Sequence, residues 1–476
     1  FDNLRLVATF KPVTNDPYLA LQWALNNDGS FYDGGATPGA DIGAFDAWKR
    51  STGSKDVNVV VFDTGVDINH PDLNDNLWVN PNEIPDNGVD DDNNGYIDDI
   101  HGWDAFYEDG TPEDGDGHGS HVSGIIGAEG NNGVGVTGIN QVASIINVRI
   151  FNEDGYTTDA AILGGYDYIS ALLDNGVSIA AVNQSWGGGI DYGDPELANI
   201  VSMFYFYASY HGLYNTVWVV SAGNSSLDHD NLLYQRFPDP IQAPNIISVA
   251  STDANDGLSG FSDYGKHTVE IGSPGTDILS TVVGGWEFYS GTSMASPYVT
   301  GAIALAANLY PNETAAAKIA RVMGTSDKIS NLMDFTITGS RLNAFESISA
   351  GEKTGEVLLS ANPSLGYFNR VDGMAQFSVG FTNTTGAAID VTGFSISGPN
   401  ADYFSTLEEF TENVTVMPGY AYGLGVVVER SMEGVYSYEA TLNISTSTGS
   451  IDIPLMVETQ KEPIAEIDNV IDDQGR

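Results

Sequence analysis

Cysteine is absent from this chain of 476 residues, which excludes disulfide bonds, thiol catalysis and metal sites built on cysteine. Basic residues are scarce, since 17 lysines and arginines stand against 64 aspartates and glutamates, for a net charge of −47. A surface of this charge repels nucleic acids and anionic membranes rather than binding them, and it favours solubility in salty water. No uninterrupted apolar run approaches ~18 residues, so the sequence predicts no membrane span.

Three short segments carry reactive side chains in the order carboxylate, imidazole, hydroxyl. The reactive residues are Asp63, His118 and Ser293, within the segments 60–65, 117–124 and 291–297. This is one of the known chain orders for a set in which serine is the nucleophile, histidine the base and aspartate its orienting partner. Together the three segments indicate nucleophilic catalysis by serine.

The surroundings of each reactive residue place it at the edge of a parallel sheet. Residues 57–62 form a nearly all-apolar, β-branched run typical of a buried parallel strand, and Asp63 follows at its C-terminal end. Catalytic groups of open α/β sheets lie at that end. His118 and Ser293 each open a segment rich in small residues, which predicts helices over 119–128 and 294–307 with the reactive residue in the N-terminal turn.

Apolar runs and helical patterns alternate along the rest of this region. Strands are predicted near 144–151, 178–184, 216–221 and 245–251, and helices near 158–173 and 195–211. Such alternation predicts an α/β fold with a doubly wound parallel sheet flanked by helices.

These motifs resemble those of the subtilisin-like serine proteases (subtilases), and the resemblance extends over residues 15–348. A fourth block, residues 219–224, resembles the family segment that carries the oxyanion-hole asparagine. The resemblance implies a subtilisin-like fold and a serine endopeptidase that hydrolyses polypeptides through an acyl-enzyme. It assigns Ser293 as nucleophile, His118 as general base, Asp63 as its orienting partner and Asn224 as oxyanion donor.

Elementary chemistry agrees with these assignments. A serine hydroxyl is a poor nucleophile until a neighbouring base takes its proton, and an imidazole with a pKa near ~6.5 does this at neutral pH. The amide of Asn224 and the backbone N–H of Ser293 can donate to the oxyanion that forms when the peptide carbonyl becomes tetrahedral.

The segment after the strand at 178–184 resembles the family segment that pairs with the peptide substrate and lines the first specificity pocket. Recognition of this kind is β-strand addition, in which main-chain hydrogen bonds bind an extended peptide. The residues assigned to it are Ser185, Trp186, Gly187 and Gly188. An ordinary turn at the two glycines is the alternative.

Oxygen-bearing side chains alternate along residues 90–99, around Gly95. This spacing lets one loop fold around a hard cation and predicts calcium. The loop is not an EF-hand, because His101 occupies the twelfth position where that motif has glutamate, so Asp98 or Asp99 is the expected closing ligand. The predicted ligands are Asp90, Asp92, Asn94, Tyr96, Asp98 and Asp99, and a solvated acidic loop is the alternative.

A second calcium site is implied only by the resemblance. The residues that match its side-chain ligands in the family are Asp16, Asp72 and Asn132. Calcium is therefore the expected cofactor, and the number of bound ions stays open.

The character of the sequence changes beyond residue 351. Short strand-like runs separated by turn residues occur at 374–381, 423–428, 438–444 and 451–457. They predict an all-β sandwich, and residues 381–399 resemble immunoglobulin-like domains appended to bacterial secreted proteins. The expected division is a subtilisin-like peptidase domain over 1–350, a β-sandwich domain over 351–460 and an acidic tail over 461–476.

The combined interpretation is a secreted, extracellular, calcium-stabilised serine endopeptidase that acts on polypeptides as a monomer. The chain begins at Phe1 without a charged and apolar leader, so a signal peptide and a pro-segment for maturation are expected outside this sequence. A non-catalytic, calcium-dependent binding or adhesion protein on a protease scaffold is the alternative. Acid-active relatives with glutamate in place of the histidine are disfavoured by His118. The cleavage-site preference and the temperature and salt optima stay open.

Overall fold

A computed structural model describes residues 14–189, 195–230, 236–237, 245–266, 268–349, 374–382, 388–406, 413–416, 421–429, 437–447 and 449–458. These residues form two compact units. The larger unit contains everything described up to residue 349, and most residues described from 374 onward belong to the smaller unit. The acidic tail predicted over 461–476 lies outside the described residues.

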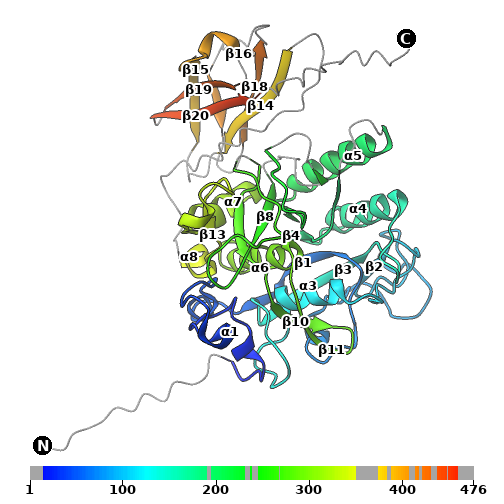
Figure 1. The fold of residues 1–476 in the computed structure, drawn as a ribbon. Helices are drawn as coiled ribbons and strands as arrows, with labels where there is room; N and C mark the ends of the chain where they lie inside the picture. Colours follow the sequence, from blue (N-terminus) through cyan, green and yellow to red (C-terminus); the bar gives the residue numbers. More distant parts are fainter. Residues whose placement is uncertain are drawn as a thin grey trace, which may run out of the picture. The chain divides into compact units, whose positions relative to one another are not determined.

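A nine-stranded sheet forms the centre of the larger unit (Figure 1). Its order is β12-β13-β9-β8-β6-β4-β1-β3-β2, and neighbouring strands are parallel except for β12 and β13. The bounds are β1 Gly53–Asp63, β2 Gly102–Asp104, β3 Val142–Arg149, β4 Ile179–Gln184, β6 Val217–Ser221, β8 Ile246–Thr252, β9 Ile271–Pro274, β12 Asp327–Lys328 and β13 Ser340–Arg341. The predicted α/β fold with a large parallel sheet is confirmed.

The central strands are apolar because helices cover both faces of the sheet. In β1, Val59 and Val61 belong to one hydrophobic core, whereas Val60 and Phe62 belong to the other. Helices α3 (His118–Gly127) and α6 (Thr292–Leu309) contribute to the first core. Helices α4 (Asp159–Asp174) and α5 (Pro195–Gly212) contribute to the second. Because side chains alternate along a strand, a continuous apolar run requires cover on both faces.

The remaining elements of this unit are short. They are α1 Phe31–Gly34, α2 Ala44–Ala47, α7 Ala315–Gly324, α8 Ala344–Ser349, the 3₁₀ turns Leu19–Leu21, Asn74–Asn76 and Ser330–Leu332, the hairpin β10 Ile278–Val282 with β11 Gly285–Tyr289, and the pair β5 Gly188–Gly189 with β7 Arg236–Phe237. Within the part of the chain that the structure describes, no helix is long and apolar enough to cross a membrane.

The smaller unit is rich in strands, arranged in two sheets. One has the order β14-β18-β16 and the other β17-β15-β19-β20. The bounds are β14 Met374–Thr382, β15 Ile389–Ser397, β16 Phe404–Thr406, β17 Val414–Val416, β18 Ala421–Glu429, β19 Ser437–Thr446 and β20 Gly449–Glu458, with a 3₁₀ turn at Ala401–Tyr403. That these sheets make an immunoglobulin-like sandwich stays a prediction.

Candidate active site

A buried carboxylate, Asp63, pairs with the partly exposed imidazole of His118. Asp63 is the last residue of β1 and is 0% exposed, and His118 is the first residue of α3. His118 Nδ1 lies 2.7 Å from Asp63 Oδ1, which also accepts the backbone N–H of Thr64 at 2.8 Å. Burial opposes protonation of the imidazole, but the charge and hydrogen bond of Asp63, together with the charges of Asp116 and Asp114, outweigh it, so the pKa of His118 is raised above its ordinary value. The arrangement orients the ring and leaves Nε2 for proton transfer.

A second carboxylate, Asp114, connects the strand of Asp63 to the helix of His118. Its carboxylate accepts hydrogen bonds from the hydroxyl of Thr64 and from the backbone N–H of Ser120, both at 2.9 Å. Thr64 Oγ1 in turn accepts the N–H of Gly119 at 2.8 Å. Sequence reasoning missed Asp114, although an aspartate shortly before a helix start is a recognisable signal for capping the free N–H groups there.

Ser293 lies in the first turn of α6 and is held by Ser185. Pro297 has no N–H, so the carbonyl of Ser293 lacks its usual helical partner four residues later. The hydroxyl of Ser185 donates to that carbonyl at 2.9 Å. In the opposite direction, Ser293 Oγ donates to the carbonyl of Ser185 at 2.8 Å. The hydroxyl of Ser293 therefore points at Ser185.

The sheet brings these pairs to one edge. Strands β1 and β4 are parallel neighbours with Val61 opposite Asn183. Asp63, at the end of β1, is therefore level with Ser185, just beyond the end of β4. Because Ser185 is bonded in both directions to Ser293, the carboxylate, imidazole and hydroxyl predicted from the sequence lie at the same carboxyl edge of the sheet.

Asn224, which follows β6, has its side chain oriented by Thr292. Asn224 Oδ1 accepts the N–H of Thr292 at 2.8 Å and its hydroxyl at 3.0 Å. The Thr292 hydroxyl also accepts the N–H of Gly223 at 3.0 Å. These bonds fix the carbonyl end of the Asn224 amide, and Asn224 lines a pocket beside Ser293. The sequence segment 291–297 singled out Ser293 but not the orienting role of its neighbour Thr292.

A pocket of about 270 Å³ opens beside Ser293. None of the described residues that line it is charged, and Trp186 is the one large side chain among them. The lining residues are Ser185, Trp186, Gly187, Ser221, Ala222, Gly223, Asn224, Ser225 and Ser293. Trp186 Nε1 donates to the carbonyl of Phe62 at 2.8 Å, which ties this wall to β1. Gly188 belongs to β5 and pairs with Phe237 of β7, and residues 190–194 and 231–235, which adjoin these strands in the sequence, are outside the described part of the chain.

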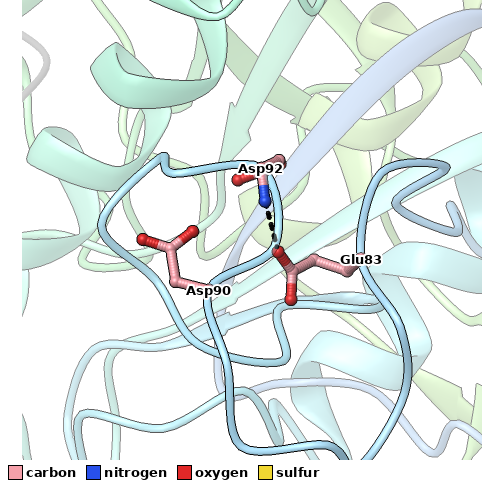
Figure 2. A group of neighbouring side chains, drawn as sticks. All are labelled: Glu83, Asp90 and Asp92. Carbon is pink, nitrogen blue, oxygen red and sulfur yellow. Dashed lines mark hydrogen bonds between the residues drawn. The ribbon is translucent and has the colours of Figure 1, made fainter.

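The acidic loop gathers two predicted ligands and one that the sequence did not indicate. Carboxylate oxygens of Glu83, Asp90 and Asp92 lie within 4.8 Å of one another. Figure 2 shows Glu83 reaching from a separate part of the loop toward the backbone of Asp92, to which it is bonded at 3.1 Å. Glu83 was missed because it stands outside the alternating run at 90–99. Only the folding of the loop brings it to the cluster.

The other predicted ligands of this loop have protein partners. Asp99 is buried and accepts Asn80 Nδ2, Asn94 Nδ2 and the hydroxyl of Tyr168 at 2.7–3.0 Å. Burial raises the pKa of Asp99 to about 6. The carboxylate of Asp98 accepts the N–H groups of Asn87 and Gly88, while the N–H of Tyr96 bonds to Asn94 Oδ1 at 2.7 Å. Asp98 and Asp99 thus lie on these donors, whereas Asp90 and Asp92, which also accept backbone N–H groups of the loop, lie with Glu83.

Asp16, Asp72 and Asn132, predicted as a second calcium site, come together from distant parts of the chain. Asn132 Nδ2 donates to Asp72 Oδ1 at 2.8 Å, and the N–H of Asn131 donates to Asp16 Oδ2 at 3.0 Å. Asp16 Oδ1 is buried without a hydrogen-bond partner among the described residues. Burial raises the pKa values of both Asp16 and Asp72. An unpartnered buried oxygen beside a second carboxylate fits a hard cation.

Five of the remaining histidines contact neighbouring residues of the described chain. His70 and His101 bond to the carbonyls of Gly285 and Trp78, and His121 stacks on Tyr289 with ring centroids 4.4 Å apart. His211 lies 2.9 Å from the hydroxyl of Ser170 and His229 lies 3.3 Å from Asp263. His267 is outside the described residues.

The subtilase family profile matches residues 54–353. The chain is 33% identical to thermitase of Thermoactinomyces vulgaris over 308 residues, which covers 64% of this chain and 93% of thermitase. It is 31% identical to subtilisin-like protease 1 of Plasmodium berghei over 324 residues, which covers 64% of this chain and 49% of that relative. A solved structure of a Pseudoalteromonas arctica protease has the same fold, with a TM-score of 0.53, 22% identity, and coverage of 71% of this chain and 99% of that one. The profile spans more than half of the chain, and the chain therefore belongs to the subtilase family of serine endopeptidases.

Proposed function

We propose that the chain hydrolyses peptide bonds through an acyl-enzyme in which Ser293 is the nucleophile, His118 the general base and Asp63 its orienting partner. The observation that carries this proposal is the convergence at one sheet edge. The 2.7 Å contact of Asp63 with His118 lies at the end of β1, and the hydroxyl of Ser293 is bonded to Ser185 at the adjacent end of β4.

The first half of the reaction follows from these positions. The hydroxyl of Ser293 turns from the carbonyl of Ser185 toward His118 Nε2, which takes its proton as Oγ bonds to the substrate carbonyl carbon. The electron pair of the C=O double bond moves to the oxygen. The backbone N–H of Ser293 and Nδ2 of Asn224 donate to that oxyanion. Asp63 stabilises the imidazolium that forms.

The second half returns the serine. The tetrahedral intermediate collapses, the C–N bond breaks, and the leaving amine takes the proton from His118 Nε2. A water molecule then attacks the acyl carbon and gives its proton to His118 Nε2. The second collapse breaks the bond to Ser293 Oγ, which recovers its proton as the new carboxylic acid leaves.

The substrate is proposed to be an extended polypeptide that pairs with the backbone of Ser185, Trp186, Gly187 and Gly188. The described lining of the pocket beside Ser293 bears no charged side chain, which supports an uncharged side chain at the residue whose carbonyl is attacked. Because backbone pairing recognises any extended chain, cleavage inside polypeptides is expected rather than removal of single terminal residues.

Calcium is proposed to stabilise the fold at two places. In the acidic loop, Glu83, Asp90 and Asp92 would hold one ion, with Asp98 and Asp99 as the further predicted ligands. Near the N-terminus, Asp16, Asp72 and Asn132 would hold another, supported by the unpartnered oxygen of Asp16. A bound cation would supply the positive charge that these carboxylates lack.

The setting of the enzyme is also a proposal. We propose a secreted, extracellular, monomeric protein that is matured by removal of a pro-segment, and the net charge of −47 is compatible with solubility in such a setting. The strand-rich smaller unit supports a separate C-terminal sandwich domain over 351–460, following a peptidase domain over 1–350.

The test is the Ser293→Ala variant of the full chain. It should fold with an unchanged circular dichroism spectrum, lose essentially all hydrolysis of peptide substrates, and lose labelling by a fluorophosphonate, because no other hydroxyl can form the acyl bond. Ser290→Ala, three residues earlier and exposed, is the matched control and should keep both. Undiminished turnover by Ser293→Ala contradicts the assignment. A wild-type chain that neither hydrolyses nor labels supports the adhesion alternative.

A further inference from the structure

The loop after Asn224 is held by a second loop that lies between β8 and β9. The N–H of Ser226 donates to the carbonyl of Phe261 at 2.9 Å, and the N–H of Tyr264 donates to the carbonyl of Leu227 at 2.9 Å. The two segments therefore run alongside each other, and the position of Asn224 depends on a part of the chain about forty residues away in sequence.

Asp263 makes the central contacts between these loops. Its carboxylate oxygen Oδ1 accepts the N–H of Ser225 at 2.7 Å and the N–H of Leu227 at 2.8 Å. Its own N–H donates to the carbonyl of Gly223 at 2.8 Å. The residues immediately before and after Asn224 are thus both bonded to the same residue, which is 0% exposed.

The carboxylate of Asp263 is stabilised in its charged form despite burial. Burial opposes the charge, but the contact with His229 and the two backbone N–H groups outweigh it and lower the pKa of Asp263. His229 Nε2 lies 3.3 Å from Oδ2, and both side chains are at most 1% exposed. A buried charge with this many donors is fixed in one orientation, so the groups bonded to it are fixed as well.

We propose that Asp263 is a positioning residue for the oxyanion donor Asn224, a role that rests on the function proposed above for that amide. Thr292 fixes the side-chain oxygen of Asn224, whereas Asp263 fixes the backbone on both sides of it. An oxyanion donor is effective only when it is already aimed at the position of the developing charge. A shift of about 1 Å is enough to cost about 100-fold in rate.

The test is a double-mutant cycle on the full chain with Asp263→Ala and Asn224→Ala. Asp263→Ala should lower kcat by about 10- to 100-fold with KM nearly unchanged, because Asn224 Nδ2 acts on charge present only in the transition state. In the Asn224→Ala background the same substitution should lower kcat by less than about threefold, because the group that it positions is gone.

Asp263→Asn is the conservative variant and keeps the cycle informative if Asp263→Ala does not fold. Its amide oxygen can still accept the N–H groups of Ser225 and Leu227, so most of kcat should be recovered, and any loss should again vanish in the Asn224→Ala background. Asp41→Ala is the matched control, since its carboxylate also accepts two backbone N–H groups, from Asn27 and Gly43. It should lower the melting temperature and leave kcat unchanged.

The outcomes separate this inference from the proposed function. An unchanged kcat in Asn224→Ala overturns the oxyanion role itself. A normal loss in Asn224→Ala, combined with an equal loss from the Asp263 substitution in both backgrounds, overturns the positioning role and leaves Asp263 a structural residue. A loss confined to KM also overturns it.

Discussion

The proposed catalytic centre and the acidic loop both concentrate carboxylates, but the groups around these carboxylates differ between the two regions. Asp63 is buried against His118 and the N–H of Thr64, and Asp114 is buried against hydroxyl and backbone donors. In the loop, Glu83, Asp90 and Asp92 lie within 4.8 Å of one another, and residues 80–99 contain no lysine or arginine. Both regions place hydrogen-bond donors on their carboxylates, but the first pairs a carboxylate with an imidazole, whereas the second crowds three carboxylates together.

The two regions also differ in their backbone conformation. Asp86, Asn93 and Asp98 in the loop have φ of 59°, 58° and 53°, in the left-handed region that favours glycine. His118 and Ser293 instead begin regular helices against a buried sheet. A loop with like charges and unfavourable backbone angles is expected to depend on an added cation, whereas the catalytic centre is organised by the fold alone.

Outside the proposed Asp63, His118 and Ser293 set, the largest effect on kcat is expected of Asn224→Ala. Removal of one oxyanion donor should lower kcat by about two to three orders of magnitude, a magnitude carried over from subtilisin itself, with little change in KM. Steady-state kinetics on a small peptide substrate measure both constants. If the loss appears in KM alone, Asn224 binds substrate in its ground state and does not stabilise the oxyanion.

Calcium removal should affect the loop and spare the chemistry. A ligand that binds only the folded state at a hundredfold excess over Kd stabilises it by about 2.7 kcal/mol, so exhaustive chelation should lower the melting temperature and expose residues 86–99 to self-cleavage. Calcium should reverse both changes more effectively than magnesium. Differential scanning calorimetry and timed proteolysis measure them.

Glu83→Gln sharpens the same comparison. It should remove part of the calcium response without changing fluorophosphonate labelling of Ser293 at low temperature, because the loop lies outside the catalytic contacts. Asp154→Asn, which changes an exposed acid elsewhere, is the control and should keep the full response. Identical melting curves with calcium and with chelator in the wild-type chain would show that the loop is only a solvated acidic turn.

The smallest expected effect is on the pH profile. Because the pKa of His118 is raised above its ordinary value of 6.5, the neutral base forms only as the pH rises through that higher value, and kcat/KM should rise with it. Asp116→Asn removes one of the nearby charges that raise this pKa and should move the inflection to lower pH by a fraction of a unit. A wild-type inflection below 6.5, or one that moves upward in Asp116→Asn, contradicts this account of the pair.

Local sequence predicted the elements that carry the site. The apolar run at 57–62 ends at Asp63 in β1, and the small-residue segments after His118 and Ser293 are α3 and α6. These signals are strong because strands and helices that pack against a sheet must have apolar or small residues at nearly every position. The division into domains at residue 350 and the roles of the site residues stay predictions.

Residues that act from a distance in sequence were not predictable in the same way. Glu83 joins Asp90 and Asp92, and Asp263 joins the segment around Asn224, only after the chain has folded. An isolated aspartate or glutamate in a loop carries no local signal for the donor that it will meet.

The sequence by itself determined which side chains are predicted to react, their order in the chain and the parallel sheet that carries them. It could do so because motif chemistry and apolar patterning act over a few neighbouring residues. Only the tertiary structure decided the register that places Asp63 level with Ser185, the hydrogen bonds between Ser293 and Ser185, and the contacts of Asp263 on both sides of Asn224. Strand register and loop packing are set by the burial of many residues at once, and no single segment contains that information.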